Sequence, residues 1–512
     1  MSRSTLIAVM VLAAVTALVY GYRLSDSPIY LTPDEIVIGL DAHTLATTGH
    51  DLRGRLLPVY FQIEEFRVAG KIWYQPAIMY LTAAVLQVAP LSAAAIRTPA
   101  VIIGVLDVVL MFLLAQRLFG RSTSAWVAAG LLMVSPAHFM HSRFAMDYVY
   151  PLPFILGWMY GLATYLEDRR PRALAGATLC LGVGFYSYIT AVFLMPAFLM
   201  LTALVLWRRR AIEHWRYGVI GFAVPFAIFV LWVGLHASVF ADTFARYGLG
   251  SSHRIGPIER FGLYWRYLSP SFLFFNGGSQ LVFSSRVAGV FPAVTALLLP
   301  VGLVVAIRRA DPMRLLWVAG VLLTAFPAIL LDEGSAINRA MGIVPFGVLL
   351  SAAGFDAVRT ARPRLTPSLV AVLAVVCVVQ FAWFSRDYFG DYRSRSAPWF
   401  QYNIRGGLDA IVERTQGSLR PVYLNDAIRW VDSYWKFQLR AVGRPDLLPV
   451  TNGFTHVDRT VPAGSLLLVP ATDPALSAEA RAAAASGDFA LVQDIIEPDG
   501  TISFIVLERR GA

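Results

Sequence analysis

Long apolar stretches alternate with short polar loops over the first three quarters of the chain. Each stretch runs for roughly 18 to 22 residues, which at about 1.5 Å per residue is enough to cross a hydrocarbon core about 30 Å thick. The pattern predicts a polytopic α-helical membrane protein with about eleven transmembrane helices plus juxtamembrane helices. The predicted spans lie near residues 4–22, 98–116, 121–140, 148–166, 173–188, 191–207, 217–238, 287–307, 315–331, 340–357 and 367–385.

The charge distribution gives these helices an orientation. The formal net charge of +10 would suggest a nucleic-acid partner in a soluble protein, but the basic residues gather in short loops between apolar segments. The positive-inside rule places such loops in the cytoplasm, so no nucleic-acid partner is predicted. We expect a multi-pass protein of a bacterial-type cytoplasmic (inner) membrane, with a cytoplasmic N-terminus and an extracytoplasmic C-terminal domain. The clusters are Arg117/Arg121, Arg169–Arg172, Arg208–Arg216, Arg308–Arg314 and Arg359–Arg364.

Two apolar segments need separate interpretation. The first, Leu6 to Tyr20, is compatible with a signal peptide but lacks a small-residue cleavage site, so we interpret it as a retained first helix. The run Pro76 to Ala89 is shorter than a full span, and counting it as a crossing would invert every later arginine cluster. We therefore expect it to be a juxtamembrane or half-buried helix on the outer face.

Two domains are predicted: a transmembrane domain over 1–390, with outer loops 23–75 and 237–286, and an extracytoplasmic α/β domain over 398–512. The second lacks a glycine-rich phosphate loop, an HExxH motif and any Cys/His metal spacing. Its period-2 and helical patterns predict alternating short elements ending in a hairpin. These are helices near Trp399–Arg414, Ala427–Arg440 and Ala478–Ala485, strands at Pro421–Leu424 and Leu466–Val469, and a hairpin turning at Asp499-Gly500.

The first outer loop carries a candidate general base. Asp34 follows the first helix directly, at a water-accessible membrane face where neighbouring charge and partial burial can tune the pKa of a carboxylate. A local structural role is the alternative, and it is the stronger on local sequence alone. Thr32, Pro33 and Glu35 fit the N-cap, N1 and N3 positions of a capping box, in which Asp34 would simply favour the helix dipole.

A second polar element joins two predicted spans at the outer face. It brings His138, His141, Arg143 and Asp147 together within a few residues. Ionisable groups at membrane depth are costly and indicate function by default, although interfacial snorkelling or an Arg143–Asp147 ion pair at i,i+4 would explain them equally well. The two histidines have no convincing third ligand nearby, so no metal site is predicted.

A third polar element, Asp332 to Arg339, lies at another outer helix junction. Arginine suits a phosphate because its planar fork donates bidentate hydrogen bonds, so Arg339 with Asn338 is a candidate anion binder. By itself the segment is more often a solvated turn. The three elements are expected to converge on one face, where base, orienting groups and anion binder would suit transfer from a phosphate-linked lipid donor.

Five segments, in this order and spacing, resemble the GT-C class of membrane glycosyltransferases. The resemblance is to the family 39 branch that includes protein O-mannosyltransferases and the lipid A aminoarabinose transferase, and it covers roughly residues 1 to 360. The matching segments are Asp34-Glu35 after the first helix, Gly39–Pro58, Gln75-Pro76 before a short apolar helix, Ile96–Ala100 leading to Gln116–Arg121, and Ser135-Pro136 with His138 leading to Asp147.

The resemblance implies an inverting transfer from a polyprenyl-monophosphate sugar. It implies that Asp34 deprotonates or orients the acceptor, that Glu35 supports it, and that Asp147 lines the same cavity. The chain departs from the family at Gln75, where many relatives have a lysine, and at Val37, where the aminoarabinose transferase has an arginine. The cation for the donor phosphate would then be Lys71, Arg67, Arg143 or Arg339, and the cavity would include Asp41, His43, Gln75, His138, His141 and Asn338.

Two other functions fit a basic polytopic chain. A lipid or glycan transporter or flippase is the main alternative, but the sequence shows neither an inverted repeat nor a set of midplane charges, with Asp107 the only acid well inside a span. A non-catalytic scaffold would not need the ordered polar turns. The sequence assigns no cofactor, leaves divalent-metal dependence open, and leaves the acceptor as a lipid, a glycan or a protein.

Overall fold

The computed structural model describes residues 2–64, 71–246, 255–416 and 418–511, and these residues form two compact units. Unit 1 comprises Met1–Tyr22, Arg55–Leu81 and Arg97–Asp387. Unit 2 comprises Arg23–Gly54, Thr82–Ile96 and Tyr388–Ala512. The expected domain boundary near 390–398 stays a prediction. What the structure adds is that two early segments pack with the C-terminal part.

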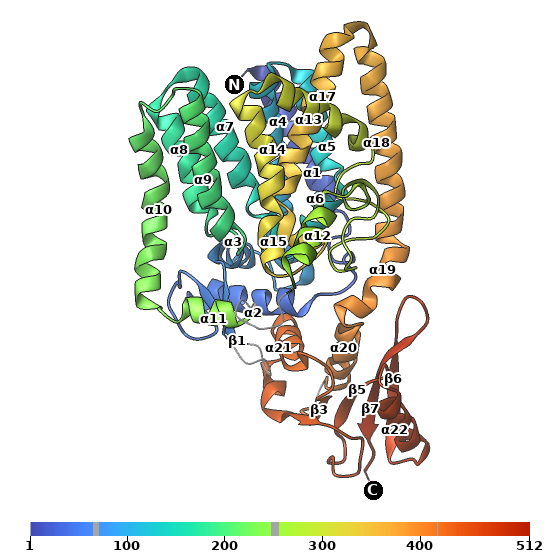
Figure 1. Cartoon of the computed structure of the whole chain (residues 1–512). Helices are drawn as coiled ribbons and strands as arrows, with labels where there is room; N and C mark the ends of the chain where they lie inside the picture. The colour runs from blue at the N-terminus through green and yellow to red at the C-terminus, as the bar shows by residue number, and fades with distance from the viewer. Residues whose placement is uncertain (1, 65–70, 247–254, 417, 512) are drawn as a thin grey trace. The chain divides into compact units, whose positions relative to one another are not determined.

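Unit 1 is dominated by long apolar helices (Figure 1). Seven helical segments among the described residues are long and apolar enough to cross a bilayer, which confirms the predicted polytopic helical class. They are α1 (Arg3–Gly21), α4 (Ala93–Phe119), α9 (Ala191–Arg208), α10 (Trp215–Leu235), α14 with α15 (Pro312–Thr324 and Phe326–Leu330), α17 (Ile343–Ala361) and α18 (Thr366–Phe389).

Shorter helices occupy the other predicted spans, so the count of eleven stays a prediction. Pro136 occupies the first helical turn of α6, and the predicted span 121–140 is accordingly divided between α5 and α6. The run expected to form a juxtamembrane helix is α3 (Pro76–Leu86), which has 11 residues. The short helices are α5 (Ser122–Met133), α6 (Pro136–His141), α7 (Leu152–Asp168), α8 (Pro171–Gly184) and α13 (Thr295–Arg309).

The loops predicted to lie outside the membrane contain defined elements of their own. In the first loop, strands β1 (Phe61–Glu64) and β2 (Lys71–Tyr74) pair antiparallel, with Phe61 opposite Tyr74. The later loops and turns carry short helices. These are α11 (Val239–Arg246), α12 (Pro257–Leu268), the π-helix η2 (Ser271–Phe275), the 3-10 helix η1 (Asp147–Val149) and α16 (Ile337–Ala340).

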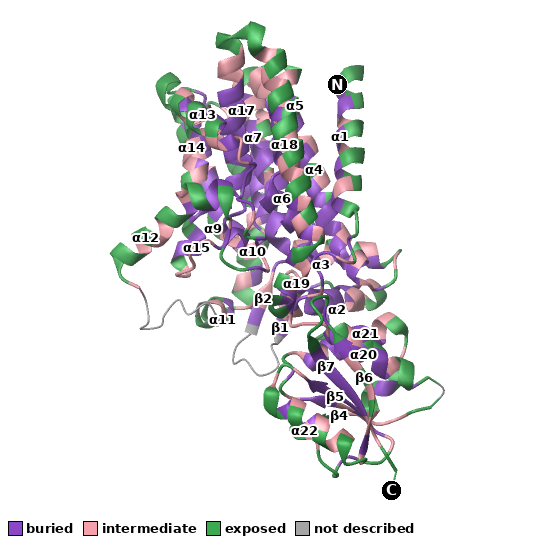
Figure 2. Ribbon diagram, turned by 90° about the vertical axis from the view of Figure 1, so that its right-hand side faces the viewer, coloured by how far each residue is buried: buried purple, intermediate pink, exposed green. Residues whose placement is uncertain are grey.

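Burial differs strongly between helices of unit 1 (Figure 2). In α17, 72% of the most apolar window is buried, whereas in α18 only 6% is. Helices α13 and α17 approach closely because Gly302 faces the Leu350 carbonyl and Gly354 faces the Leu298 carbonyl, positions where a side chain would strike backbone. Small residues at such contacts are typical of membrane helix packing. Helix α17 is therefore central to the bundle.

Unit 2 contains a five-stranded mixed sheet in the order β4-β3-β5-β7-β6. Strand β3 (Val422–Asn425) pairs in parallel with β4 (Thr451–Phe454) and β5 (Leu466–Pro470), while β7 (Ile502–Arg509) is antiparallel to β5 and β6 (Phe489–Ile496). Every residue of β5 is buried, as expected for a central strand. The helices of this unit are α2 (Pro33–Thr48), α19 (Asp391–Ser396), α20 (Ile404–Arg414), α21 (Val431–Val442) and α22 (Pro474–Ala485).

The predicted α/β character of the tail is confirmed. The expected strands coincide with β3 and β5, and the hairpin turning at Asp499-Gly500 joins β6 to β7. Strand β4 was not predicted. Its sequence, Thr-Asn-Gly-Phe, contains the strand-poor residues Asn452 and Gly453 and forms only through parallel pairing with β3.

Candidate active site

Helix α2 begins with the capping box that the sequence indicated. The Thr32 side chain accepts a hydrogen bond from the Glu35 backbone N–H at 3.3 Å, and the Thr32 N–H donates to Glu35 Oε2 at 3.0 Å. Thr32 and Glu35 are both buried, and Glu35 has no exposed surface. Glu35 is therefore committed to the helix start, which is consistent with a supporting role and leaves direct chemistry to its neighbour.

Asp34 occupies the N2 position between the two partners of this box and is only partly buried. The box is complete with Thr32 and Glu35, so its hydrogen bonds do not require the Asp34 carboxylate. The dipole of α2 stabilises a negative charge at its N-terminus and so favours the ionised form of an aspartate there. The capping role therefore falls to Thr32 and Glu35, and a catalytic role of Asp34 stays a prediction.

The C-terminal part of unit 2 holds this helix in place. Tyr434 of α21 donates a hydrogen bond to the Leu31 carbonyl at 2.7 Å, immediately before the cap. Arg440 Nη1 donates to the Leu40 carbonyl at 3.2 Å and to Thr44 Oγ1 at 2.8 Å. Burial raises the pKa of Tyr434, and the carboxylates of Glu35 and Asp34 raise it further. The α21 contacts therefore position both the start and the middle of α2.

The other predicted residues of α2 stabilise the same region. Asp41 is buried, and its Oδ1 accepts a hydrogen bond from the Leu52 N–H at 2.9 Å, which fixes the chain after the helix ends. His43 is partly buried, and desolvation followed by the positive charge of Arg440 lowers its pKa. His43 is therefore mainly neutral near pH 7, able to accept a hydrogen bond.

In unit 1, His138 belongs to a fully buried polar chain. Its Nδ1 lies 2.8 Å from the Tyr20 hydroxyl and its Nε2 lies 3.1 Å from Asp107 Oδ2. The Tyr20 hydroxyl also donates to the Met133 carbonyl at 2.9 Å. All three side chains have no exposed surface. This network links α1, α4 and α6, and it orients the turn that follows α6.

Arg143 and His141 lie in or next to that turn. Arg143 is fully buried, donates through Nη1 to the Tyr20 carbonyl, and stacks its guanidinium 5.2 Å from the centre of the Phe139 ring. His141 donates through Nδ1–H to the Ala137 carbonyl at 2.8 Å and stacks on Phe283 from a later loop. Within the described residues, its Nε2 has no hydrogen-bond partner.

Two of the three predicted polar elements meet in unit 1. Pro136 and Met140 of α6 and Ile337 of α16 line one narrow cavity. Helix α6, which carries His138, and helix α16, which carries Asn338 and Arg339, are therefore neighbours. Asp147 starts η1 beyond the first turn and is 4% exposed. The first element, with Asp34, belongs to unit 2, and its predicted convergence with the other two stays a prediction.

The remaining predicted residues differ in their surroundings. Arg339 Nε donates to Glu333 Oε2 at 2.9 Å. Gln75, just before α3, and Asn338 are buried, and neither side-chain carbonyl oxygen has a partner among the described residues. Lys71 lies in β2, paired through the backbone with Glu64, whereas Arg67 lies outside the described residues. Buried amide oxygens without partners are uncommon in proteins and mark positions where a ligand can supply the donor.

No group of three or more His, Cys, Asp or Glu side chains in the described parts of the chain is arranged to hold a metal ion. The chemistry that the described site can supply is a partly exposed carboxylate on a fixed helix, with buried amides and guanidinium groups elsewhere. This combination suits proton abstraction next to an anionic group.

Comparison with known proteins gives a family match over part of the chain and a fold match over nearly all of it. Residues 75–233 match the family model described as dolichyl-phosphate-mannose-protein mannosyltransferase. The fold of nearly the whole chain is similar to that of two solved structures. These findings agree with the resemblance seen in the sequence: residues 75–233 match a mannosyltransferase family model, and nearly the whole chain shares its fold with the two solved structures.

Two solved structures similar to this chain are of ArnT from Cupriavidus metallidurans. The apo state is 15% identical, with a TM-score of 0.56, and the complex with undecaprenyl phosphate is 13% identical, with a TM-score of 0.52. Each comparison covers 99% of this chain and 98% of the other. No curated protein matches this chain in sequence.

Several residues of the site were assigned no role from the sequence. Tyr20 lies near the end of an ordinary apolar helix. Nothing in the neighbouring sequence indicates that its hydroxyl contacts a histidine 118 positions later. Tyr434 and Arg440 reach α2 across about 400 residues of chain. Asp107 did give a signal, since an acid inside an apolar span requires a partner, and that partner is His138.

Proposed function

We propose that this protein is an inverting glycosyltransferase that moves a sugar from a polyprenyl-monophosphate donor to an acceptor at the outer face of the cytoplasmic membrane. The observation that carries the proposal is the family match within a GT-C fold, combined with a partly exposed aspartate at N2 of a capped and clamped helix. The complex of ArnT with undecaprenyl phosphate, which has a similar fold, supports a polyprenyl phosphate as the lipid part of the donor.

The reaction is a single displacement at the anomeric carbon. An acceptor oxygen forms the new glycosidic bond while its proton passes to the Asp34 carboxylate. The bond between the anomeric carbon and the phosphate oxygen breaks, and the electron pair leaves with the polyprenyl phosphate. Attack from the face opposite the phosphate inverts the anomeric configuration. Asp34 is the general base in this scheme, and Glu35 contributes by holding the helix start.

The leaving phosphate needs cations, and the four candidates are not equivalent. Arg143 is already engaged by the Tyr20 carbonyl and Arg339 by the Glu333 carboxylate. An ion pair with a carboxylate reduces the positive charge that Arg339 can offer to a phosphate. Lys71 and Arg67 of the first outer loop are the other two candidates, beside Arg143 and Arg339. Asp147, His138, His141, Gln75 and Asn338 are proposed to complete the wall of the substrate cavity.

The topology belongs to the same proposal. The N-terminus would lie in the cytoplasm, and the 398–512 domain would lie outside with the loops 23–75 and 237–286. The domain lacks catalytic spacing in its sequence, so its proposed roles are to hold α2 and to take part in acceptor recognition. The acceptor is a lipid, a glycan or a protein that presents a hydroxyl or similar nucleophile.

A transfer assay with the purified protein tests the proposal. The full chain, reconstituted in lipid nanodiscs, is given a panel of polyprenyl-phosphate sugars together with candidate acceptors, and products are analysed by mass spectrometry and by the anomeric configuration. We expect one donor to yield a glycosylated acceptor of inverted configuration. Movement of the intact donor lipid across a vesicle membrane without cleavage of the sugar–phosphate bond would instead establish a transporter and refute the proposal.

A further inference from the structure

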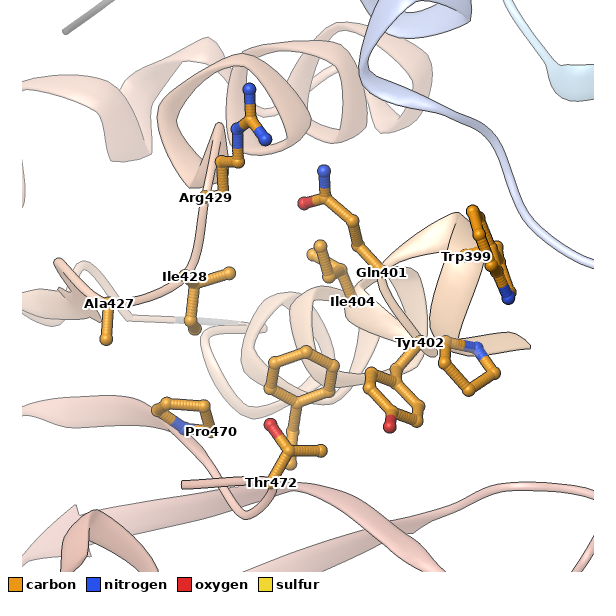
Figure 3. A pocket seen from close by; sticks show the side chains of 11 residues that line it. Trp399, Gln401, Tyr402, Ile404, Ala427, Ile428, Arg429, Pro470 and Thr472 are labelled. Carbon is orange, nitrogen blue, oxygen red and sulfur yellow. The ribbon is translucent and has the colours of Figure 1, made fainter. Parts of the chain in front are cut away.

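Unit 2 contains a cavity of about 490 Å³ that the proposed catalytic chemistry does not use. Four segments form it: the turn leading into α20, the connection between β3 and α21, the end of β5 with the residues after it, and the start of β7 (Figure 3). The volume falls within the range of small-molecule sites. The residues that matter most for its chemistry are Trp399, Gln401, Tyr402, Arg429, Thr472 and Phe504.

The lining combines an apolar floor with polar groups that are not used elsewhere. Phe504 is buried, whereas the Trp399 side chain is 44% exposed. Across the described structure, the side chains of Gln401, Tyr402, Arg429 and Thr472 make no hydrogen bond or ion pair. Figure 3 shows Arg429 and Gln401 along one side of the cavity and Tyr402 and Thr472 along the other. Polar groups of several kinds therefore face a common space with their hydrogen-bonding capacity free.

Backbone hydrogen bonds hold the rim of the cavity in an uncommon conformation. Gln401 and Tyr402 are consecutive non-glycine residues in the left-handed region, with φ of 60° and 59°. Such residues persist only where the surroundings hold them, at a cost of order 1 kcal/mol or more each. Here the Tyr402 N–H donates to the Ala397 carbonyl at 2.9 Å, and the next N–H, of Asn403, donates to Glu497 Oε1 at 2.8 Å. The rim is thus preorganised, which reduces the entropy lost on binding.

These features fit a sugar better than a purely apolar ligand. A sugar ring has C–H faces that pack against the electron-rich face of an aromatic ring, and hydroxyls around its edge that need donors and acceptors. An amide, a phenol and a hydroxyl supply both. Arg429 is the only charged side chain among the lining residues, so it adds a preference for a negatively charged substituent.

We propose that this cavity binds a sugar unit of the acceptor that carries a carboxylate or phosphate group. The inference rests on the proposed function and extends it, since it assigns part of acceptor recognition to a site built wholly within unit 2. Trp399 packs on the sugar ring, Gln401, Tyr402 and Thr472 bind its hydroxyls, and Arg429 binds the anionic substituent.

Binding of small sugars to the full chain tests this assignment. The protein is placed in phosphatidylcholine nanodiscs, which avoids detergents with sugar head groups, and saturation-transfer NMR and calorimetry measure D-glucose, D-glucuronate, D-glucose 6-phosphate and inorganic phosphate. We expect dissociation constants in the millimolar range, corresponding to about 4 kcal/mol, with at least one anionic sugar bound roughly tenfold more tightly than glucose. The carboxylate and phosphate probes decide which substituent is preferred.

Variants separate the contributions. Arg429→Gln should reduce the affinity for the anionic sugar to that for glucose, and Trp399→Ala should weaken both about tenfold. Arg510→Gln is the matched control, because Arg510 is an exposed arginine of the same unit that does not line the cavity. Thermal unfolding must be unchanged in each variant used. Equal binding of inorganic phosphate and sugar phosphate, or no effect of Arg429→Gln, would overturn the assignment.

Turnover distinguishes this inference from the proposed function. With an acceptor that carries an anionic sugar, Arg429→Gln should raise the KM for the acceptor about tenfold and leave kcat and donor binding unchanged. If wild-type protein transfers sugar but no probe binds the cavity, only the cavity assignment fails. If the probes bind as expected but no donor is ever cleaved, the proposed function fails while the sugar site stands.

Discussion

Two aspartates of this protein show how differently the same side chain can be placed. Asp34 stands in the first turn of α2, partly exposed, beside a capping box that is complete without it. Asp107 lies within α4 with no exposed surface, and its Oδ2 is 3.1 Å from His138 Nε2. Both carboxylates would attract interest in a sequence, yet only the first has an environment that a substrate can reach.

The difference lies in what each carboxylate does for the fold. Removal of Asp107 would leave a buried histidine nitrogen without its partner, and would disturb the chain that runs through Tyr20 to α6. Removal of Asp34 leaves the Thr32–Glu35 cap in place. We therefore expect mutation of Asp107 to act on stability and mutation of Asp34 to act on turnover.

The largest expected effect is that of Asp34→Asn on transfer. A general base contributes roughly 10²–10⁴ in rate, or about 3–5 kcal/mol of transition-state stabilisation, so turnover should fall by that factor. The substitution keeps the size of the side chain, and expression, thermal stability and donor binding should stay near wild type. Steady-state transfer by the reconstituted protein measures the turnover. Binding of a labelled donor is the control. A variant with more than about a tenth of wild-type turnover would exclude Asp34 as base and make Asp147 the next candidate.

Asp107→Leu is expected to have the next largest effect, on stability. It leaves the buried His138 Nε2 without its hydrogen-bond partner, which lowers the free energy of unfolding by about 1–3 kcal/mol. The double variant Asp107→Leu/His138→Leu should recover part of the loss, since both polar partners are then replaced. Equilibrium unfolding in mixed micelles measures the stability of wild type, both single variants and the double variant. A stable Asp107→Leu protein that lacks transfer activity would contradict the division between the two aspartates and place Asp107 in the chemistry.

Thr32→Ala tests the capping role separately from the catalytic one. It removes the side-chain acceptor for the Glu35 N–H, and the loss of an N-cap residue costs about 1 kcal/mol of stability. Transfer should fall far less than in Asp34→Asn, because the carboxylate itself remains. Thermal unfolding and transfer measured on the same preparation test this. A loss of transfer as complete as that of Asp34→Asn, in a folded protein, would show that the cap and the base cannot be separated.

The smallest expected effect concerns pH and His43. Burial and Arg440 lower the pKa of folded His43, so between that pKa and the unfolded value near 6.5 the unfolded chain binds more protons. The contribution of His43 to stability is therefore present above the unfolded pKa and is lost as the pH falls. Melting temperatures at pH 7.5 and 5.5 should differ less in His43→Gln than in wild type. An unchanged pH dependence would remove His43 from this explanation.

The sequence was informative where a signal is local and silent where contacts are distant. The capping box at Thr32 follows from three neighbouring residues, and apolar length predicted α1, α4, α10 and α17. Strand β4 could not be predicted, because its pairing depends on β3 rather than on its own residues. The same holds for the site. The pattern selected Asp34, whereas Tyr434 and Arg440 become relevant only once α21 packs on α2.

Helix α18 has a consequence for the membrane around the protein. With the preceding turn it forms a 27-residue helical segment, about 40 Å long at 1.5 Å per residue, and only 6% of its most apolar window is buried by protein. A hydrocarbon core about 30 Å thick is shorter than that, so the ends of the segment, where Arg364 and Arg386 lie, would enter the head-group layer. Helix α17 is fixed by its neighbours instead. Lipid chains would therefore cover nearly the whole apolar surface of α18, whereas neighbouring helices cover most of α17.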